Sequence, residues 1–473
     1  MGNKNRELWV SAGGNTPDHW EIVSLEELLL TPKSISVGVM YPGKHDPAGV
    51  PLIKVGDVKD GCITSEPESR VSNQVDEEYK RTRLSGNELL ITLVGNPGDC
   101  VVVTENMAGW NAARALAVLK LKDSDLREWI KLILVSHPSK HIIDSRLNTT
   151  VQKTLNLKDI KELPIPIPPS HEREWLCGVV GALEKKSFLN SQINKTLEQI
   201  AQALFKSWFV DFDPVIDNAL DAGNPIPEAL EVKAEQRKQL RAMAVKGEAE
   251  VPILPDDICS LFPSEFEFTE EMGWIPKGWK VSTVGGCFDV TMGQSPPGST
   301  YNEADEGMPF FQGRADFGFR FPSNRVYCTE PKRFANKSDT LISVRAPVGD
   351  INMAMENCCI GRGVAAVRHK LGSRSYSYYA MNQLSEHFKV FESEGTVFGS
   401  INQKDFKALP QLEANVVLLK EFDQLVEAID NKVELQSLEI SNLTTLRDIL
   451  LPKLISGELQ IPDAEQLVTE ALS

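Results

Sequence analysis

The segment LEQIAQALFKSWFVDFDP, residues 197–214, determines how the rest of this chain is interpreted. Apolar residues recur in it at helical spacing, which predicts a helix with one apolar stripe: Leu197, Ile200, Leu204 and Trp208. The stripe leads into an aromatic cluster, and an Asp-Pro pair at its end is predicted to stop the helix. Taken alone, such a stripe is more typical of a buried helix than of a functional site.

The composition indicates a globular protein with more than one domain. The chain has 473 residues, of which 41% are hydrophobic and 25% charged, and a single core of that size is uncommon. No apolar run approaches the roughly 20 residues that cross a bilayer, and residues 1–16 contain too little apolar material for a signal peptide. We therefore expect a cytoplasmic location and no membrane contact. The eight cysteines show no C-x-x-C spacing, so neither disulfides nor a zinc site is predicted.

Charge is spread unevenly along the chain. The formal net charge is −16, and residues 211–271 hold 15 acidic and 5 basic residues. Most of the acidity therefore lies in one segment, and its middle is predicted to be a charged, solvated helix. Basic surfaces elsewhere remain compatible with an acidic total.

The chain contains a long internal repeat, which predicts two similar units. Each copy shows short β-rich runs, at residues 88–94, 100–104 and 114–121 in the first copy, and this pattern predicts a curved sheet. The second copy repeats the runs at 340–345, 350–355 and 363–368. The matching segments are 17–25 with 276–284, 90–93 with 341–344, and 150–164 with 396–410.

Each copy ends in a predicted long helix, at about residues 171–208 and 416–451. Prolines precede the first helix, Ser170 is its expected N-cap, and Pro452 with Gly457 is expected to stop the second. Heptad stripes run along both helices: Leu176, Val179, Leu183, Ile193, Leu197, Ile200 and Leu204 in the first, and Phe422, Val426, Ile429, Val433, Ile440, Leu443 and Leu450 in the second.

Helices of this length, about 54 Å, cannot bury such stripes within a small domain, so we expect them to pair with each other. Polar residues interrupt the seams at Lys186 and Asn190 in the first helix and at Lys432 and Gln436 in the second, where they are expected to set the register. The predicted fold is mixed α/β (α+β), with two globular units separated by two long helices that pair as an antiparallel coiled coil.

The motifs of common enzymes are missing from the sequence. There is no G-x-x-x-x-G-K-[ST], no G-x-G-x-x-G after a strand and no [DN]-P-P-[YFW]. His137 and His141 are four residues apart, but no third ligand lies near them in the sequence. We therefore predict no catalytic residue and no metal site in this chain.

Recognition of DNA is the better-supported chemistry, because basic and amide side chains gather in the less regular loops of both copies. Arginine pairs with guanine, glutamine pairs with adenine, and lysine or arginine grips phosphates. For any single residue, a solvated surface position is the more common interpretation, and Arg345 and Arg362, which apolar strand residues flank, are equally compatible with buried structural arginines. The candidate DNA contacts are Lys54, Lys80, Arg81, Arg83 and Lys153 in the first copy, and Gln294, Ser295, Gln312, Arg314, Arg320, Lys332, Arg333, Arg345 and Arg362 in the second.

Several motifs together carry a resemblance to a known family. They are LEQIA (197–201), LFKSWFVDF (204–212), LRDILLPKLISGEL (446–459), MGQSP (292–296), VRAPVGD (344–350) and IGRG (360–363). With these motifs the chain resembles the specificity subunit of type I restriction–modification systems. The likeness extends over nearly the whole chain beyond its first dozen residues. Gly98 lacks the Arg-Ala-Pro context of the second copy, so the first unit resembles a different recognition subfamily.

The resemblance implies a non-catalytic subunit with two target recognition domains, each of which reads one half of a split, asymmetric DNA sequence. The helices would act as a ruler for the spacer. The expected partners are double-stranded DNA, two modification (methyltransferase) subunits and two restriction (translocase and nuclease) subunits. No cofactor is expected in this chain, whereas S-adenosylmethionine, ATP and magnesium are expected on the partners.

The resemblance also suggests boundaries and an interface. Candidate helix and subunit contacts are Leu197, Ile200, Leu204, Phe205, Trp208, Phe209, Leu446, Leu450 and Leu454. The expected divisions are a first recognition domain (15–168), a central helix (169–214), an acidic connecting segment (215–271), a second recognition domain (272–411), a C-terminal helix (412–460) and a tail (461–473). Two alternatives stay open: a self-sufficient DNA-modifying enzyme with an unrecognised catalytic centre, and a coiled-coil scaffold protein. The sequence does not give the DNA target or its spacer, nor whether a restriction subunit is present.

Overall fold

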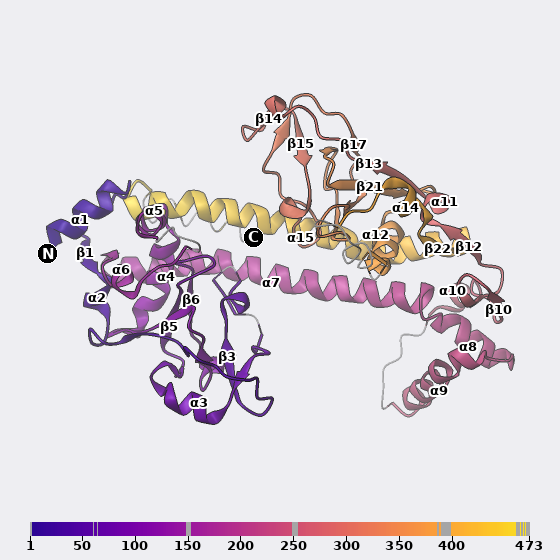
Figure 1. Ribbon diagram of the computed structural model, residues 1–473, viewed down its shortest axis with the longest axis horizontal. Coiled ribbons are helices and arrows are strands. Elements are labelled where there is room, and N and C mark those ends of the chain that lie inside the picture. The colour runs from indigo at the N-terminus through magenta and orange to yellow at the C-terminus, as the bar shows by residue number, and fades with distance from the viewer. Residues whose placement is uncertain are drawn as a thin grey trace. The chain divides into compact units, whose positions relative to one another are not determined.

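The computed structural model in Figure 1 divides into two compact units. Unit 1 comprises residues 1–188 and 440–473, and unit 2 comprises residues 189–439. Two long helices, α7 (Ser170–Phe209) and α15 (Val416–Ser456), each contribute to both units. The structure describes residues 2–59, 61–63, 65–147, 153–247, 254–385, 387–388 and 399–459, with 464, 467 and 469. Part of the expected 150–164 and 396–410 match, and most of the expected tail, lie outside these residues.

An antiparallel four-stranded sheet forms the centre of unit 1. Its order is β2-β8-β5-β6, and every residue of β5 is buried. The predicted β-rich runs are confirmed, with ends two or three residues shorter because the chain turns at Asn96-Pro97-Gly98 and around Arg114. The bounds are β2 (Ile35–Val37), β5 (Glu88–Thr92), β6 (Cys100–Val102) and β8 (Leu116–Lys120).

A second small sheet of unit 1 has the order β4-β3-β7. The strands β3 (Val50–Ile53) and β7 (Asn111–Ala112) run parallel, and β4 (Arg70–Val71) pairs antiparallel with β3. Asn111 is buried, and its side chain is satisfied because it donates to Asp76 at 2.9 Å and accepts from the Thr82 hydroxyl at 2.7 Å. Such satisfaction makes a buried amide tolerable.

The remaining elements of unit 1 include an N-terminal helix, α1, that the sequence analysis did not predict. Its Trp9 is fully buried in the unit's main core, together with Trp20 and Trp129. Strand β1 pairs antiparallel with β9, just before α7 begins. The bounds are α1 (Gly2–Ser11), β1 (Glu21–Ser24), α2 (Leu25–Leu28), α3 (Asn73–Glu78), α4 (Arg127–Val135), α5 (His137–Arg146), α6 (Leu157–Lys161) and β9 (Pro164–Ile167).

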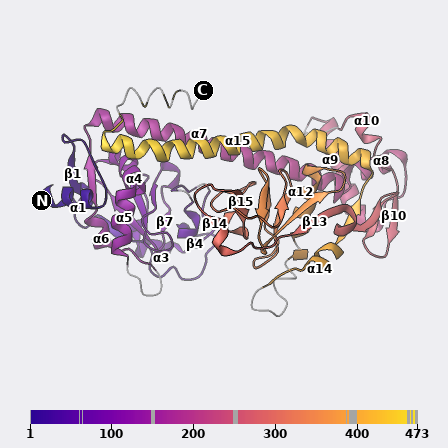
Figure 2. The same ribbon diagram turned by 90° about the horizontal axis from the view of Figure 1, so that it is seen from above.

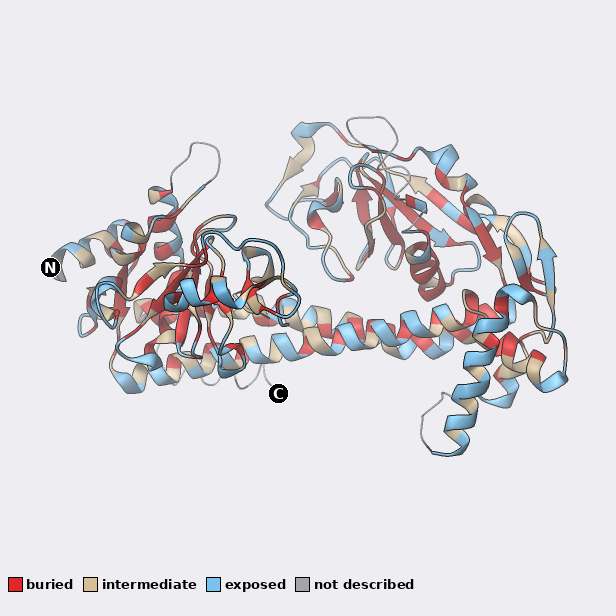
Figure 3. Ribbon diagram, turned by 60° about the horizontal axis from the view of Figure 1, so that its bottom comes forward, coloured by how far each residue is buried: buried red, intermediate tan, exposed pale blue. Residues whose placement is uncertain are grey.

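Unit 2 repeats this plan, as the internal repeat predicts. Its sheet β13-β21-β18-β19 matches β2-β8-β5-β6, and a parallel pair β15–β20 matches β3–β7. Buried residues concentrate in these strands (Figure 3). The bounds are β12 (Lys280–Thr283), α11 (Val284–Cys287), β13 (Phe288–Met292), β14 (Tyr301–Asn302), β15 (Met308–Phe311), β16 (Tyr327–Cys328), β17 (Phe334–Ala335), β18 (Thr340–Ser343), β19 (Ile351–Met353), β20 (Cys358–Ile360), β21 (Val364–His369), α12 (Arg374–Gln383), α14 (Gln403–Ala408) and β22 (Pro410–Glu413).

Within unit 2, α7 and α15 run antiparallel, as predicted. The Asn190 amide donates to Glu439 at 2.8 Å, and Asn194 donates to Ser437 at 3.2 Å. Further along, Phe205 of α7 meets Phe422 of α15 with ring centroids 5.6 Å apart. Figure 2 shows the two ribbons side by side.

The predicted stripe of α7 is partly wrong. Ile193 and Ile200 are exposed, Val179, Leu197 and Leu204 are only half-buried, and the buried face instead carries three polar side chains: Asn190, Asn194 and Glu198. The 3.6-residue period of a helix drifts against a strict heptad repeat, so the contact face moves around α7. For α15 the predicted positions Phe422, Val426, Val433, Leu443 and Leu450 are buried.

Helix α7 ends at Phe209, before the Asp213-Pro214 pair, and α15 ends at Ser456, before Gly457, as predicted, but neither proline is itself the stop. Pro214 lies at the start of a new helix, α8 (Asp213–Ala222), after a turn at Phe212 with φ of 59°. Proline suits a first helical turn because the missing N–H would be unpaired there. Pro452 lies inside α15, which continues to Ser456 before Gly457 at φ of 75°.

The acidic connecting segment contains a helical hairpin rather than a solvated helix alone. Helix α9 (Glu231–Val245) packs beside α8 through charge pairs: Arg237 with Asp217, and Arg241 with Asp221 at 2.8 Å. Helix α10 (Asp256–Cys259) and the pair β10 (Phe266–Thr269) and β11 (Gly273–Pro276) follow. Among the described helices, none is long and apolar enough to cross a membrane.

Candidate nucleic-acid interface

The register of unit 2 brings the ends of several strands to one edge. Strands β15 and β20 run parallel, with Phe311 opposite Ile360, so both end on the same side. Strand β17 is antiparallel to β20, so the residues just before β17 lie on that side as well. We call this the unit 2 loop edge. It comprises residues 293–296, 312–314, 332–333, 345–346 and 361–363.

Backbone hydrogen bonds hold these loops against one another. The N–H of Gln294 donates to the Ile360 carbonyl at 3.0 Å, and the N–H of Ile360 donates to the Arg333 carbonyl at 2.9 Å. Gly363 donates to the Gln312 carbonyl at 3.1 Å. The N–H of Val344 donates to the Gly363 carbonyl at 2.9 Å, which places residues 345–346 beside residues 361–363. The five segments therefore form one surface.

Gly293 is required for this close approach. A Cβ at this position would lie 2.1 Å from the Gly361 carbonyl oxygen, inside any allowed contact distance. Gly38 of unit 1 has the equivalent place, where a Cβ would lie 2.1 Å from the Ala112 carbonyl oxygen. In unit 1 the residue after β2 therefore lies directly against the turn before β8. In unit 2 the residue after β13 lies directly against the turn before β21.

Most side chains of the unit 2 loop edge point a cation or an amide toward solvent. Arg362 is exposed, and its Nε donates to the Ser295 hydroxyl at 3.4 Å. Arg314 pairs with Asp350 at 2.7 Å while both stay about half exposed. Exposed arginine and glutamine are the side chains that recognise guanine and adenine in the major groove. The exposed candidates on this edge are Gln294, Gln312, Arg314, Lys332, Arg333, Arg345 and Arg362, with Ser295 half-buried.

Arg320 is a correction to the candidate DNA contacts. Only 2% of it is exposed, and its guanidinium pairs with Glu198 and Asp430 inside unit 2. Burial opposes the charged form of Arg320, but the neighbouring tyrosines and carboxylates raise its pKa above the usual value for arginine. A buried, paired guanidinium cannot reach a base, so Arg320 has a structural role.

Unit 1 has a corresponding loop edge, comprising residues 39–41, 54–57, 94–97, 113–115 and 153–154. Ala113 donates to the Ile53 carbonyl at 2.8 Å, and Leu155 donates to the Leu93 carbonyl at 2.9 Å. The candidates Lys54 and Lys153 are both exposed there. Val94 occupies the position of Arg345, because Val94 bridges to Thr154 as Arg345 bridges to Ser400.

Three further candidates of unit 1 belong to a different neighbourhood. Lys80 and Arg81 lie in a short helical turn after α3, and Lys80 pairs with Glu77 at 3.3 Å. Arg83 pairs with Asp76 and with Glu77, and these hydrogen bonds raise its pKa. Its charge is already balanced within the unit, whereas Arg81 is exposed.

Met40 and Tyr41 were missed by the sequence analysis. They follow β2 where Ser295 and Pro296 follow β13, and Tyr41 is 76% exposed. The exposed Tyr41 ring on the unit 1 loop edge offers both an apolar surface and a hydroxyl. Aligning the Gly38 and Gly293 positions could have revealed them.

The candidate interface residues are placed in cores rather than on open surfaces. Phe205, Trp208 and Phe209 are buried in the main core of unit 2, where they contact Phe422. In unit 1, Leu450 and Leu454 are buried and Leu446 packs partly buried beside them. Among the nine candidates, Ile200 alone is exposed, whereas Leu197 and Leu204 are half-buried.

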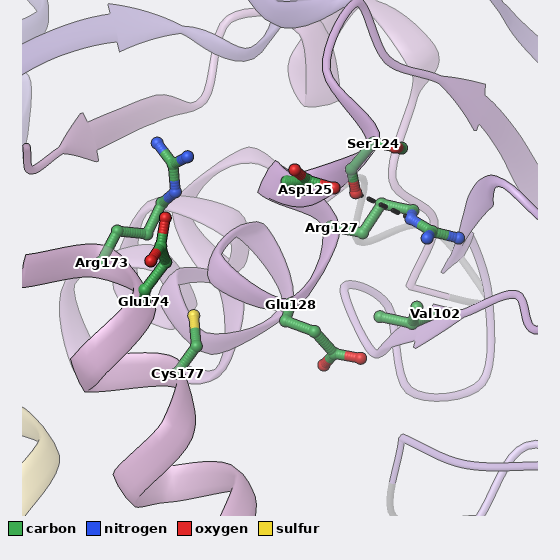
Figure 4. Close-up of a pocket in the computed structure, with 8 residues that line it drawn as sticks. All are labelled: Val102, Ser124, Asp125, Arg127, Glu128, Arg173, Glu174 and Cys177. Carbon is green, nitrogen blue, oxygen red and sulfur yellow. Dashed lines mark hydrogen bonds between the residues drawn. The ribbon is translucent and has the colours of Figure 1, made fainter. Parts of the chain in front are cut away.

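A polar hollow of about 390 Å³ in unit 1 does not have the arrangement of a catalytic centre (Figure 4). The guanidinium of Arg127, which lines this hollow, donates hydrogen bonds to three backbone carbonyls, those of Ser124, Gly86 and Val103. Burial raises the pKa of the Cys177 thiol to about 11, so it is not a ready nucleophile. His137 and His141 stack with ring centroids 6.3 Å apart. Within the residues that the structure describes, no His, Cys, Asp and Glu group could hold a metal.

Comparison with known proteins assigns the fold to a family. The family model described as "Type I restriction modification DNA specificity domain" matches residues 17–202 and 276–439, which together cover most of the chain. The chain belongs to this specificity-domain family. The two matched segments coincide with the two copies of the repeat, each with part of its long helix.

Relatives within the family match along much of the chain. A protein of Methanocaldococcus jannaschii named "Putative type I restriction enzyme MjaX specificity subunit" is 26% identical and covers 95% of each chain. The "Type I restriction enzyme HindI specificity subunit" of Haemophilus influenzae is 26% identical over 71% of this chain and 78% of its own. The type I S subunit structure from M. genitalium is 15% identical, covers 93% and 97%, and has a TM-score of 0.49.

Proposed function

We propose that this chain is the DNA specificity subunit of a type I restriction–modification complex. Each recognition domain reads one half of a bipartite, asymmetric DNA target, and the long helices set the spacer and dock the methyltransferase subunits. The chain itself is not an enzyme. The observation that carries the proposal is the match of the specificity-domain family to both copies of the repeat.

The two loop edges support a division of the target into two different halves. The unit 2 loop edge presents Arg345 and Arg362 with glutamine side chains, whereas the unit 1 loop edge presents Lys54, Lys153 and the Tyr41 ring. Because the side chains at equivalent positions of the two edges differ, with Val94 in unit 1 where unit 2 has Arg345, and because side chains that face the groove read the bases, the two domains recognise different half-sites.

The partners follow from this role. Double-stranded DNA lies along the loop edges, two modification subunits supply S-adenosylmethionine-dependent adenine-N6 methylation, and two restriction subunits supply ATP- and magnesium-dependent translocation and cleavage. We propose recognition domains at residues 15–168 and 272–411, helical segments at 169–214 and 412–460, the acidic connection at 215–271 and a tail at 461–473. We place the complex in the cytoplasm, with the genomic DNA. No observation favours a self-sufficient modifying enzyme or a scaffold protein.

Mapping N6-methyladenine across the host genome, with and without the gene for this chain, tests the proposal. We expect one bipartite methylated motif, with two specific halves and a fixed nonspecific spacer, that disappears when the gene is removed. Purified chain alone should not methylate DNA. An unchanged methylome in cells that express the modification subunit would overturn the proposal.

A further inference from the structure

A buried charge cluster connects the second recognition domain to both long helices within unit 2. The Nη1 of Arg320 pairs with Glu198 of α7, and its Nη2 pairs with Asp430 of α15. The three residues are only 2%, 8% and 4% exposed. One guanidinium thus joins a loop of the recognition domain to the two helices.

The cluster is enclosed by aromatic and polar side chains of α12. The Arg320 Cζ lies 3.7 Å from the centroid of the Tyr378 ring, and its Nη1 donates to the Tyr379 hydroxyl at 3.0 Å. The Ser375 hydroxyl donates to Asp430. The guanidinium is therefore fixed by a ring face and by a hydrogen bond as well as by two carboxylates.

The same loop leads back to the unit 2 loop edge. It begins at Arg314 on that edge and reaches Arg320 six residues later. Its course is fixed to β19, because the Met353 N–H donates to the Arg320 carbonyl at 2.8 Å and Asn352 donates to the Gly318 carbonyl at 2.9 Å. The angle of the edge on the helices therefore depends on where the Arg320 side chain is held.

Unit 1 has a weaker counterpart at the matching place. Lys131 of α4 pairs with Glu184 of α7 at 3.3 Å, and Arg447 of α15 approaches Glu184 at 3.7 Å. Glu184 follows Pro164 by as many residues as Asp430 follows Pro410, so the two carboxylates are equivalent in the repeat. The Glu184 and Arg447 side chains are about one third exposed, and solvent-exposed pairs hold geometry poorly.

Buried ion clusters contribute little net stability, because desolvation offsets the attraction between the charges. Two carboxylates face the Arg320 guanidinium here, and the partly exposed Arg374 approaches one of them, Asp430, at 3.9 Å. A bidentate arginine does impose geometry, because its planar fork fits both partners in one orientation. Such a cluster is better explained by orientation than by stability.

We propose that Glu198, Arg320 and Asp430 form an orientation lock that holds the second recognition domain at one angle on the helix pair and sets how strictly the complex discriminates spacer length. These are positioning residues, since they act on DNA through the domain they hold. The equivalent Lys131–Glu184 pair of unit 1 involves a carboxylate that is one third exposed and that no aromatic ring of the described residues encloses, so we expect the strictness to come mainly from the second domain. This inference rests on the proposed function.

The test uses the full chain assembled with its modification subunit. Methylation rates are measured on duplexes that carry the genomic motif with its own spacer, or with a spacer one base pair longer or shorter. The variant E198Q/R320M/D430N removes all three charges together, so no buried charge is left unpaired. The matched control K131M/E184Q neutralises the equivalent pair of unit 1.

We expect the ratio of rates on native and altered spacers to fall at least tenfold in the neutralised variant, while mismatches within each half-site are rejected as before. In the control the ratio should stay within about threefold. A folded variant that loses activity equally on all spacers, or keeps its ratio within twofold, overturns the proposal. If the triple variant does not fold, R320K decides instead, because an ammonium cannot bridge both carboxylates, and an unchanged ratio there overturns the lock. Failure of the wild-type complex to methylate any bipartite motif would refute the proposed function rather than the lock.

Discussion

Replacing Arg362 with alanine should relax recognition at one half-site and leave the other intact. Arg362 is exposed on the unit 2 loop edge, and Ser295 orients it through bonds to its backbone N–H and its Nε at 3.3 and 3.4 Å. A bidentate arginine–base contact contributes about 1–3 kcal/mol of discrimination. The methylation rate on the correct target should therefore fall about 5- to 160-fold, with a much smaller loss on targets already mismatched at the contacted base pair.

The assay compares methylation rates of the assembled complex on duplexes with single changes in either half-site. Arg368→Ala is the matched control, because Arg368 lies toward the other end of β21 and pairs there with Asp339 at 2.6 Å. This control removes the same charge without touching the loop edge, so half-site discrimination should be unchanged. An equal loss on every sequence, as a phosphate contact would give, or relaxation in the half read by unit 1 would refute the reasoning.

Three further substitutions test other parts of the structure. Gly293→Ala places a Cβ 2.1 Å from the Gly361 carbonyl oxygen, so methylation should fall at least about tenfold while circular dichroism shows a folded protein; wild-type activity would contradict the packing of the edge. Trp208→Ala should lower the free energy of unfolding of unit 2, measured in urea, by about 3–5 kcal/mol. Ile200→Ala, at a 50% exposed position, should change it by no more than about 0.5 kcal/mol. Equal effects of the two substitutions would mean that Ile200 is buried, as the heptad pattern predicted. Burial lowers the pKa of His369 to about 4. The unfolded chain therefore binds the extra proton between pH 6.5 and 4, and the free energy of unfolding should drop by about 3 kcal/mol as pH falls through that window. His369→Gln should abolish this part of the pH dependence in urea titrations at pH 7 and 4.5.

Local patterns in the sequence were enough to predict the main strands and the two long helices. Apolar β-branched runs predicted β5, β8 and β18 because short buried strands carry that composition wherever they occur. The repeat predicted two units of one plan, and the heptad positions of α15 predicted its buried face. Arg362 and Gln312 were candidates because loop arginine and glutamine are recognisable without a structure.

Pairing between segments that are distant in the sequence decided where the loop edge forms and which side chains are buried. The loop edge exists because β15 and β20 run parallel, which brings Gln312 beside residues that lie some 50 positions later, and no local pattern specifies that register. The role of Arg320 also depended on tertiary contacts, since an arginine in an irregular loop looks exposed until Glu198 and Asp430 are found around it. Residues 197–214 show both what the sequence determined and what the tertiary structure decided. Its sequence determined a helix with an aromatic end, whereas packing in unit 2 buried Trp208 and left Ile200 in solvent, because a helix turns past a heptad seam and only its neighbours decide which side is covered.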